Sequence, residues 1–318
     1  MLEIINLTVK FNTQSGELKA CDKVNLKLEK GKNLGLVGES GCGKSMTCLS
    51  ILKLLPAEAQ ITWGQVLYNG KNLLKMNNKG LRSIRGNKIS MIFQEPMSSL
   101  NPVLTIGEQM REAIIAHKGL SKSEADKEVI SLLEKVKIDK PEARMYEYPH
   151  NLSGGMRQRV MIAMAISLKP DLLIADEPTT ALDVTTQAQV LELLDELQRE
   201  YKMSVLIVSH DFGVIARLAD TIAVMYAGEI VEYASSEVLF KHPAHPYTKA
   251  LLYSLKQMQA KKDSLTVLKG NVCDLSNLPT GCRFEERCSL ADNSCKSGVN
   301  KLIEIDKGHY VRCFKCQI

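Results

Sequence analysis

The feature that most constrains the fold of this 318-residue chain is a glycine-rich segment, GESGCGKS, at residues 38–45. It follows a nearly continuous apolar run at residues 32–37 and precedes an expected helix at residues 46–55. Between a buried strand and a helix, such a loop presents backbone N–H groups to phosphate, and its glycines allow a close approach. Lys44 is then expected to reach the terminal phosphates of a nucleotide, and Ser45 to bind Mg²⁺. A glycine-rich turn without a ligand is disfavoured, because both flanking elements are those that the loop requires.

Strand and helix patterns alternate along the rest of the chain. Apolar or alternating segments predict strands at residues 2–9, 24–28, 88–93, 172–175 and 204–208 and a strand pair near 222–231. Helical patterns occur at residues 106–117, 123–136, 155–168, 184–201, 212–219 and 248–259. Ser123, with Asp126 three residues on, is the expected start signal of the second of these helices. The alternation indicates an α/β fold with a largely parallel sheet and an all-helical insertion at about residues 100–165.

The composition excludes some classes of function. Hydrophobic residues make up 45% of the chain and charged residues 24%, and the net charge of +5 comes from basic residues that are dispersed along the sequence. This argues against nucleic acid as a partner, since a basic stripe is missing. The N-terminus lacks the layout of a signal peptide, and the apolar stretches are far shorter than the ~20 residues of a membrane helix. We expect a cytoplasmic chain that relies on another chain for any membrane-spanning part.

Acidic and polar side chains follow several of the expected strands. Asp176 and Glu177 end an apolar strand, where Asp176 could hold the Mg²⁺ shell and Glu177 could act as general base toward an attacking water. His210 and Gln94 follow two further strands, and ligands of open α/β sheets bind at this edge. A solvated acidic loop and a structural histidine are the alternatives. The phosphate loop favours the functional interpretation, because it requires a metal partner.

A second anion site is predicted at residues 152–159, with the sequence LSGGMRQR. Ser153, Gly154 and Gly155 open a helix, so backbone amides and one hydroxyl point toward a ligand at the helix start. The alternative is a simple N-cap, in which Ser153 stabilises the helix and the glycines are incidental. The chain therefore carries two helix starts suited to phosphate, separated by a helical insertion.

Together these segments resemble an ABC ATPase. GESGCGKS, Gln94, LSGGMRQR, LLIADEP, TALD and SHD occur in that family's order and at its spacing over about residues 1–235. The resemblance implies a P-loop NTPase fold with a mostly parallel central sheet, an N-terminal antiparallel β subdomain and a helical subdomain, plus a small Cys-rich C-terminal extension. We place the ATPase domain at residues 1–240, with the helical subdomain at about 100–165, and the extension with its Cys-rich tail at residues 241–318.

The resemblance also implies roles for individual residues. Glu177 would be the catalytic base, His210 the switch histidine, and Gln94 a sensor that relays the nucleotide state to a membrane subunit. Asp183 would face a dimer partner, and it also suits the N-cap of the helix that follows it. Phe11 falls where the family places an aromatic ring on the adenine, although a half-buried strand residue is an equal explanation.

Nucleotide and metal contacts follow from the same resemblance. The residues expected to bind ATP are Phe11, Gly38, Ser40, Gly41, Cys42, Gly43, Lys44, Ser45, Met46, Gln94, Asp176, Ser153, Gly154, Gly155 and Asp183. The residues expected to hold Mg²⁺ are Ser45, Gln94 and Asp176, and the catalytic group is Lys44, Gln94, Glu177 and His210. In the family's head-to-tail dimer, Ser153 and Gly155 contact the γ-phosphate that is held by the partner's Lys44. Hydrolysis would be in-line attack of water, catalysed by positioning and charge stabilisation.

Three segments resemble a narrower group, the ATPases of oligopeptide and dipeptide importers and of their relatives for nickel. They are SMIFQEPMSSLNP at residues 90–102, KHPAHPYTKALL at 241–252 and the Cys-rich tail. This group implies four kinds of partner: a second ABC ATPase subunit, homologous or identical, two transmembrane permease subunits and an extracytoplasmic substrate-binding protein. The chain would then be peripheral on the cytoplasmic face of the cell membrane and would power peptide import.

Three alternatives differ in function. An importer ATPase for nickel or another small ligand would share all of these segments. A non-transport ABC ATPase, acting on DNA or in translation, usually shows paired ATPase domains, a coiled coil or inserted zinc modules. A stand-alone kinase or GTPase would leave LSGGMRQR unexplained.

Six of the nine cysteines lie between residues 273 and 316. Cys282, Cys288, Cys295 and Cys313 supply four thiolates, which suit a tetrahedral Zn²⁺ or a [4Fe–4S] cluster. Zinc ribbons prefer C-x₂-C pairs, and the importer group links this pattern to the iron–sulfur cluster. Cys316 forms such a pair with Cys313, so it could replace Cys313 as the fourth ligand or favour zinc.

Two further expectations concern the tail. His309, next to these thiols in the sequence, is assigned to the surface rather than to a metal. A metal group would pin a tail that is too small for a core of its own. Cys288→Ser is therefore expected to loosen the tail while leaving the nucleotide contacts intact.

Overall fold

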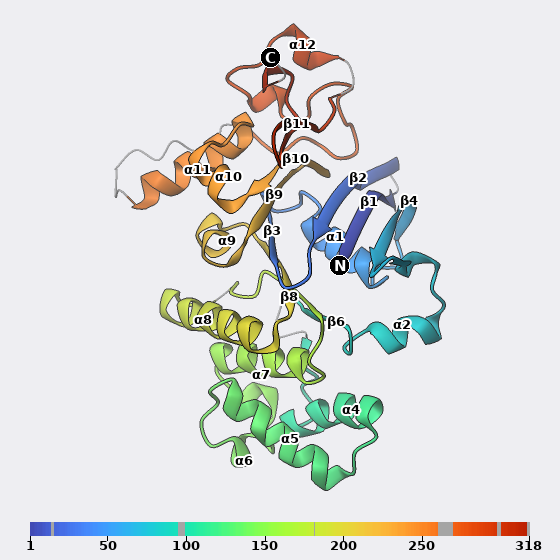
Figure 1. The fold of residues 1–318 in the computed structure, drawn as a ribbon, viewed down its shortest axis with the longest axis vertical. Coiled ribbons are helices and arrows are strands. Elements are labelled where there is room, and N and C mark those ends of the chain that lie inside the picture. The colour runs from blue at the N-terminus through green and yellow to red at the C-terminus, as the bar shows by residue number, and fades with distance from the viewer. Residues whose placement is uncertain (14–15, 95–98, 181, 260–269, 298–299, 317–318) are drawn as a thin grey trace. The chain divides into compact units, whose positions relative to one another are not determined.

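The computed structural model describes residues 1–318 except 14–15, 95–98, 181, 260–269, 298–299 and 317–318 (Figure 1). The chain forms two units. The first comprises Met1–Lys75 and Val208–Ile318, and the second comprises Met76–Ile207. Each unit is described by itself.

An antiparallel sheet of the first unit has the strand order β2-β1-β4-β5. Its strands are β1 (Leu2–Thr13), β2 (Gly16–Leu28), β4 (Ala59–Tyr68) and β5 (Lys71–Asn72). The sequence predicted the first half of β1 and the end of β2 but not β4. Alternation is weak in β4, where Trp63 is 70% exposed and Gly64 has φ 108°. This sheet is the expected N-terminal antiparallel subdomain.

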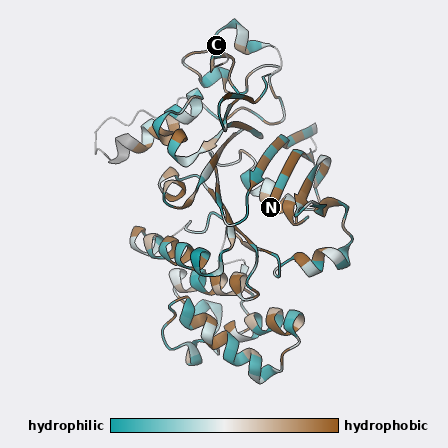
Figure 2. Ribbon diagram, viewed as in Figure 1, coloured by the Kyte–Doolittle hydropathy of each residue, from teal (hydrophilic) through white to brown (hydrophobic). Residues whose placement is uncertain are grey.

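The other sheet of the first unit has the order β11-β12-β10-β9-β3. Its strands are β3 (Asn33–Val37), β9 (Thr221–Tyr226), β10 (Glu229–Ser235), β11 (Ile303–Asp306) and β12 (His309–Val311). β3 and β9 are parallel, and the remaining pairs are antiparallel. Every residue of β3 is buried, as its apolar run predicts, and Figure 2 shows the central strands β3 and β9 as mainly hydrophobic.

Helices of the first unit pack on this sheet and also occur in the C-terminal region. They are α1 (Lys44–Ile51), α9 (Phe212–Leu218), α10 (Ser236–Lys241), α11 (Pro246–Gln259) and α12 (Asn293–Lys296), with short 3₁₀ turns η1 (Leu73–Lys75), η3 (Glu285–Arg287) and η4 (Phe314–Cys316). α9 packs closely on β3, since a Cβ at Gly35 would lie 2.5 Å from Ile215 Cγ2. Helix α1 begins at Lys44 and ends at Ile51, four residues earlier than the pattern predicts.

The second unit contains strands in the order β8-β7-β6 and the helical region. Its strands are β6 (Ile89–Ile92), β7 (Leu172–Asp176) and most of β8 (Ser204–Ser209), and β6 is parallel to β7. Its helices are α2 (Asn78–Ile84), α4 (Ile106–Lys118), α5 (Lys122–Lys135), α6 (Pro141–Arg144), α7 (Gly154–Ile166) and α8 (Val184–Tyr201), with the turn η2 (Pro149–Asn151). All residues of β7 and β8 are buried.

The predicted start of α5 was wrong by two residues. Ser121, not Ser123, is the N-cap: its hydroxyl accepts from the Glu124 N–H, and the Glu124 carboxylate accepts from the Ser121 N–H. This reciprocal pair is a capping box, which satisfies two otherwise free helix donors. Asp126 instead forms an ion pair with Arg111 of α4.

The C-terminal tail returns to the first-unit sheet. Tyr310 and Val311 of β12 pair with Tyr233 and Glu232 of β10. The assignment of His309 to the surface was wrong, because its side chain is 6% exposed and its Nε2 lies 2.8 Å from Oε1 of the fully buried Glu232. The division at residue 240 into an ATPase domain and an extension stays a prediction.

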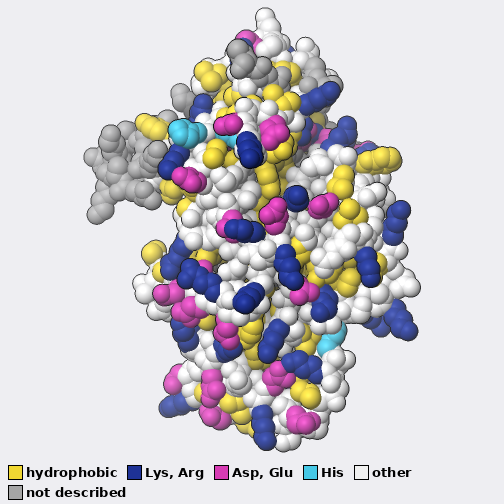
Figure 3. All heavy atoms as spheres, in the orientation of Figure 1, with side chains coloured by type: hydrophobic (Ala, Val, Ile, Leu, Met, Phe, Trp, Pro, Cys, Tyr) yellow, Lys and Arg dark blue, Asp and Glu magenta, His cyan; other side chains and the backbone are white. Residues whose placement is uncertain are grey.

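Two observations concern the surface charge and the length of the helices. On the face shown in Figure 3, Lys and Arg side chains alternate with Asp and Glu, and the described residues of this face form no continuous basic stripe. Within the described ranges, the chain contains no helix that is both long and apolar enough to cross a membrane.

Candidate functional site

The phosphate loop joins β3 to α1. At two of its glycines, neighbouring backbone atoms leave no room for a side chain. Gly43 is the N-cap of α1 with φ 107°, and a Cβ there would lie 2.2 Å from the Ala20 carbonyl oxygen. A Cβ at Gly38 would lie 2.2 Å from the carbonyl oxygen of Met225, at the end of β9. Real Cβ atoms do not approach so closely, so a side chain at either position would move the loop. The loop is therefore built from residues that leave its backbone free to approach a ligand.

Lys44 lies inside the curve of this loop. Its side chain is buried, and its Nζ donates to the carbonyl oxygens of Gly38 (2.7 Å) and Glu39 (3.0 Å). Ser45 and Met46 follow in the first turn of α1 and are half-buried. The amides of this turn and the ammonium group together favour an anion at the helix N-terminus.

The remaining predicted residues of the loop differ in exposure. Ser40 and Gly41 are exposed, and no atom lies within 4 Å of a Cβ placed at Gly41. Cys42 is buried, and burial raises the pKa of its thiol. The loop is thus anchored at Cys42 and Gly43 and open to solvent at Ser40 and Gly41.

The second unit brings together two predicted catalytic residues, Glu177 and Gln94. Gln94 follows β6, and its Nε2 donates to Glu177 Oε2 at 3.3 Å. The Thr180 hydroxyl donates to the same carboxylate oxygen at 2.8 Å. Glu177 has φ 48°, a left-handed conformation that costs roughly 1–3 kcal/mol in a residue other than glycine and is concentrated at functional sites. Asp176, the last residue of β7, is 3% exposed.

The start of α7 was interpreted from the sequence either as an anion site or as a simple N-cap. Ser153 is the N-cap, and its hydroxyl accepts from the Met156 N–H at 3.3 Å. Gly154 and Gly155 form the first turn, and a Cβ at Gly155 would lie 2.6 Å from Thr186 Cγ2 of α8. The capping role of Ser153 is therefore present, and Gly155 permits a close approach of two helices. Contact with a nucleotide stays a prediction for all three residues.

Asp183 is the N-cap of α8. Its carboxylate accepts from the N–H (2.9 Å) and the hydroxyl (2.7 Å) of Thr186, and the backbone hydrogen bond lowers the pKa of Asp183 below its usual value. The side chain is exposed. The capping role is thus present, and the partner-facing role stays a prediction.

His210 and Phe11 belong to the first unit. His210 follows the last residue of β8 and is exposed. Phe11 is half-buried on β1, where it pairs with Leu18 of β2 and Ala59 of β4. Its position in the sheet agrees with the alternative of a strand residue and leaves one side accessible.

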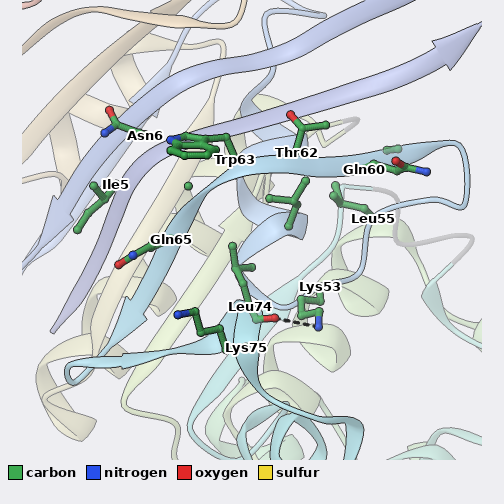
Figure 4. Close-up of a pocket in the computed structure, with 13 residues that line it drawn as sticks. Ile5, Asn6, Lys53, Leu55, Gln60, Thr62, Trp63, Gln65, Leu74 and Lys75 are labelled. Atoms are coloured by element: carbon green, nitrogen blue, oxygen red, sulfur yellow. Dashed lines mark hydrogen bonds between the residues drawn. The ribbon is translucent and has the colours of Figure 1, made fainter.

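A wide, open cavity of about 1080 Å³ lies elsewhere in the first unit (Figure 4). Trp63 and Asn6 contribute side chains, and Lys53 Nζ donates to the Leu74 carbonyl oxygen at 3.2 Å. None of the predicted nucleotide contacts is among the lining residues. The phosphate loop is therefore not part of this cavity.

The four predicted thiols of the tail line one small cavity. Cys282, Cys288, Cys295 and Cys313 surround it, together with His245 and other residues, whereas Cys316 is not among the lining residues. The Cys282 N–H donates to the Cys295 carbonyl oxygen at 2.8 Å. This backbone contact holds two of the four thiols in the same part of the tail.

The cavity thiols differ in their electrostatics. Burial raises the pKa of Cys282 to about 11, whereas a hydrogen bond from Cys316 lowers the pKa of Cys313 to about 6. The Cys316 sulfur also lies 3.5 Å from the Ala244 carbonyl oxygen. Among the described residues, no group of three or more His, Cys, Asp or Glu side chains has the spacing of a single metal ion's ligands.

Sequence reasoning missed a contact between the tail and the phosphate loop. Arg287 of η3 forms two hydrogen bonds with the Glu39 carboxylate, Nη1 to Oε2 at 2.7 Å and Nη2 to Oε1 at 3.0 Å. The carboxylate raises the pKa of Arg287 above its usual value. Tyr247 of α11 accepts a hydrogen bond from the Glu39 N–H at 3.0 Å. No local sequence pattern predicts a contact between two residues that are 248 positions apart in the chain.

Comparisons with known proteins bear on the whole chain. Residues 21–180 match the family described as ABC transporter, and residues 231–295 match the family described as oligopeptide/dipeptide transporter, C-terminal region. The oligopeptide transport ATP-binding protein AppD of Bacillus subtilis is 48% identical over 315 residues, 99% of this chain and 96% of AppD. The dipeptide transport ATP-binding protein DppD of the same organism is 50% identical over 289 residues, 91% of this chain and 86% of DppD.

Among solved structures, a dimeric post-hydrolysis state of the ATP-binding cassette MJ0796, bound to ADP and Pi, has a TM-score of 0.67. Its sequence is 28% identical, and the match covers 74% of this chain and 99% of that one. The fold described above is therefore that of an ATP-binding cassette, as its sequence motifs predicted.

Proposed function

This chain belongs to the ABC transporter family, and from that premise we propose that it is an ATP-hydrolysing subunit that powers the import of di- or oligopeptides across a membrane. The observation that carries the proposal is the phosphate loop between β3 and α1, with Lys44 held inside it, in a chain that resembles peptide-transport ATP-binding proteins almost from end to end. AppD and DppD are an oligopeptide and a dipeptide transport ATP-binding protein, so peptides are preferred to nickel as the cargo.

The residues of the loop would bind the nucleotide. Lys44 and the amides of α1 bind the β- and γ-phosphates, and Phe11 stacks on the adenine. Mg²⁺ would be held by Ser45, Asp176 and the side-chain oxygen of Gln94, and when bound it neutralises charge on the phosphates. These oxygen donors are of the type that Mg²⁺ prefers, and Gln94 donates to Glu177 through its nitrogen rather than using its oxygen.

Glu177 would act as the general base. Thr180 and Gln94 both donate to one carboxylate oxygen, and these two bonds orient the group to accept a proton from the attacking water. His210 would contact the γ-phosphate and stabilise the charge that develops on it. Catalysis then rests on orientation and charge rather than on a covalent step.

A dimer would complete each site. The start of α7, with Ser153, Gly154 and Gly155, would contact the nucleotide held by a second ABC ATPase subunit, with Asp183 facing that subunit. An N-cap serine and a 13-residue helix supply the hydroxyl and the partial positive charge that this requires. Two permease subunits and an extracytoplasmic binding protein complete the importer, with this chain on the cytoplasmic face of the membrane.

The tail would hold a [4Fe–4S] cluster on Cys282, Cys288, Cys295 and Cys313. All four thiols line one cavity, which supports a shared group. A single tetrahedral Zn²⁺ needs its sulfurs within about 4 Å of one another, given Zn–S bonds of about 2.3 Å. The cluster is preferred to zinc because the first three cysteines are spaced more widely in the sequence than the C-x₂-C pairs of zinc ribbons. Cys316 would act as a hydrogen-bond donor to Cys313 rather than as a ligand.

Iron, acid-labile sulfide and zinc per chain, measured on protein purified without oxygen, test this part of the proposal. Iron and sulfide near about four each are expected for one cubane cluster. Zinc near one would replace the cluster with a zinc site. A chain without any of these would refute a metal role for the tail.

Turnover by a Glu177→Gln variant tests the ATPase. Removal of a general base should lower the ATPase rate by roughly a hundredfold or more, while ATP stays bound and the dimer persists on a sizing column. Glu192→Gln, an exposed glutamate of α8, is the matched control and should turn over like the unaltered chain. Normal hydrolysis by Glu177→Gln would refute the assignment of the base.

A further inference from the structure

Arg287 lies between two of the cavity cysteines in the sequence. It ends the turn η3, which starts three residues after Cys282, and it directly precedes Cys288. The turn is held by its own backbone: the Arg287 N–H donates to the Phe284 carbonyl oxygen and the Cys288 N–H to the Glu285 carbonyl oxygen, both at 3.1 Å. The position of Arg287 therefore depends on the order of this part of the tail.

The guanidinium group of Arg287 is fixed as well. Its side chain is 5% exposed, its Nη1 lies 3.4 Å from the Tyr226 hydroxyl, and it stands over the rings of Tyr226 (5.8 Å) and Phe284 (5.9 Å). These contacts aim the planar group at the Glu39 carboxylate, which it meets through two parallel hydrogen bonds. Such paired bonds set orientation as well as strength.

Glu39 is the second residue of the phosphate loop, and three of its groups form hydrogen bonds. Its carboxylate binds Arg287, its N–H donates to Tyr247, and its carbonyl oxygen accepts from Lys44 at 3.0 Å. Two of these three contacts come from the C-terminal region, and the third is with the lysine that would bind phosphate. The tail and the lysine thus act on one residue of the loop.

We propose that Arg287 is a positioning residue for nucleotide binding, through which the order of the cysteine-lined tail sets the affinity of the phosphate loop for ATP. This rests on the proposed function, since it takes the loop as an ATP site. Arg287 acts in two ways. It fixes the backbone of Glu39, and it neutralises a carboxylate that would otherwise repel the phosphates of the nucleotide. Loosening the tail would therefore weaken ATP binding, although no residue of the tail is among the predicted nucleotide contacts.

The test is a titration of the purified chain with a fluorescent ATP analogue in the presence of Mg²⁺. Arg287→Ala should raise the Kd about tenfold, the effect of losing a charge-assisted pair. Glu39→Gln in the same chain should bring the Kd back toward that of the unaltered chain, because the uncompensated charge is gone. Melting temperatures of the single and double variants, measured alongside, separate this role from one in folding alone, because Glu39→Gln also removes an unpaired, partly buried carboxylate. Arg287→Lys keeps the charge but not the two parallel hydrogen bonds. Its Kd should lie between that of the unaltered chain and that of Arg287→Ala.

Arg283→Ala is the matched control. Arg283 lies in the same tail segment and pairs with Asp22 and Glu229, neither of which belongs to the phosphate loop. Its loss should leave the Kd within about twofold, inside the noise of such comparisons. Should Arg287→Ala fail to fold, the double variant with Glu39→Gln and the lysine variant still supply the comparison.

A second arm links the tail to the loop. Cys288→Ser should raise the Kd in the unaltered chain but add little in the Arg287→Ala background, because both changes break the same connection. Metal content and protease resistance, measured alongside, show that the tail has loosened.

The outcomes separate the two proposals. An unaltered chain that binds no ATP analogue refutes the ATP site and this inference with it. An unaltered chain that binds, with a folded Arg287→Ala variant of the same Kd or with no rescue by Glu39→Gln, refutes the inference alone. Additive effects of Cys288→Ser and Arg287→Ala would overturn the link to the tail.

Discussion

The buried carboxylate of Glu232 joins three segments, and its replacement by glutamine should release one of them. Glu232 is fully buried on β10. Its Oε1 accepts from the Ala244 N–H at 2.8 Å and lies 2.8 Å from His309 Nε2, while its Oε2 accepts from the His245 N–H at 2.9 Å. The carboxylate thereby ties the bend before α11 and the strand β12 to β10.

The magnitude follows from what a glutamine can accept. Its single oxygen can serve Ala244 and His309, but its NH₂ group then faces the His245 N–H, and two donors oppose each other. One charge-assisted hydrogen bond, worth about 1.5–3 kcal/mol, is lost and a buried N–H stays unsatisfied. The two remaining bonds become neutral and weaker. We expect a local loss of about 4 kcal/mol, within the range seen when one member of a buried charged pair is removed.

Amide hydrogen exchange measures this loss where it occurs. A local loss of about 4 kcal/mol corresponds to exchange of the Ala244 and His245 amides that is about a thousandfold faster. Glu237→Gln is the control, because the Glu237 side chain is 74% exposed and forms an ion pair with Lys241 on the same helix. It should leave these amides unchanged. Exchange in Glu232→Gln within tenfold of the unaltered chain would refute the account of Glu232 as the anchor.

Two further changes have defined outcomes. Gly155→Ala should lower the melting temperature, because its Cβ would lie 2.6 Å from Thr186 Cγ2, and Thr186→Ser should restore it by removing that methyl group; failure of the rescue would show that another contact limits the site. Burial lowers the pKa of His245 to about 3, so the folded chain keeps this ring neutral while the unfolded chain takes up a proton below about pH 6.5. Stability should therefore be lost as the pH falls from about 6.5 toward 3, and His245→Gln should lose less over pH 7 to 5 in urea titrations than the unaltered chain; equal losses would contradict the assignment.

The sequence predicted those elements whose pattern reports burial directly. β7 and β8 are apolar runs that are buried at every residue, and α8 spans the predicted residues 184–201. β4 was missed because its sequence does not alternate between buried apolar and exposed polar residues. Trp63 is exposed, and Gly64 adopts φ 108° where the ladder with β1 shifts register between Ile5 and Thr8. A bulged, half-exposed strand shows no clear alternation.

For the candidate site, local sequence predicted which residues take part but did not predict all of their contacts. Strand ends indicated that Gln94 and Glu177 would converge, and the structure shows their side chains hydrogen-bonded. The left-handed φ of Glu177 has no sequence signal, since such conformations are rare in glutamate. The pair of Arg287 and Glu39 depends on how the tail folds back, which no spacing encodes. The expectation that tail and nucleotide contacts are independent did not include that pair.

The pairing of β12 with β10 also sets an order of events during synthesis. β10 ends at Ser235, but its partner strand begins only at His309. While the ribosome makes the intervening residues, Cys282, Cys288 and Cys295 emerge without the fourth thiol. Cys313 follows two residues after β12, so docking of that strand delivers it to the cavity. Synthesis and docking of β12 therefore complete the thiol set, and a chain released before residue 309 would have neither the strand nor the fourth sulfur.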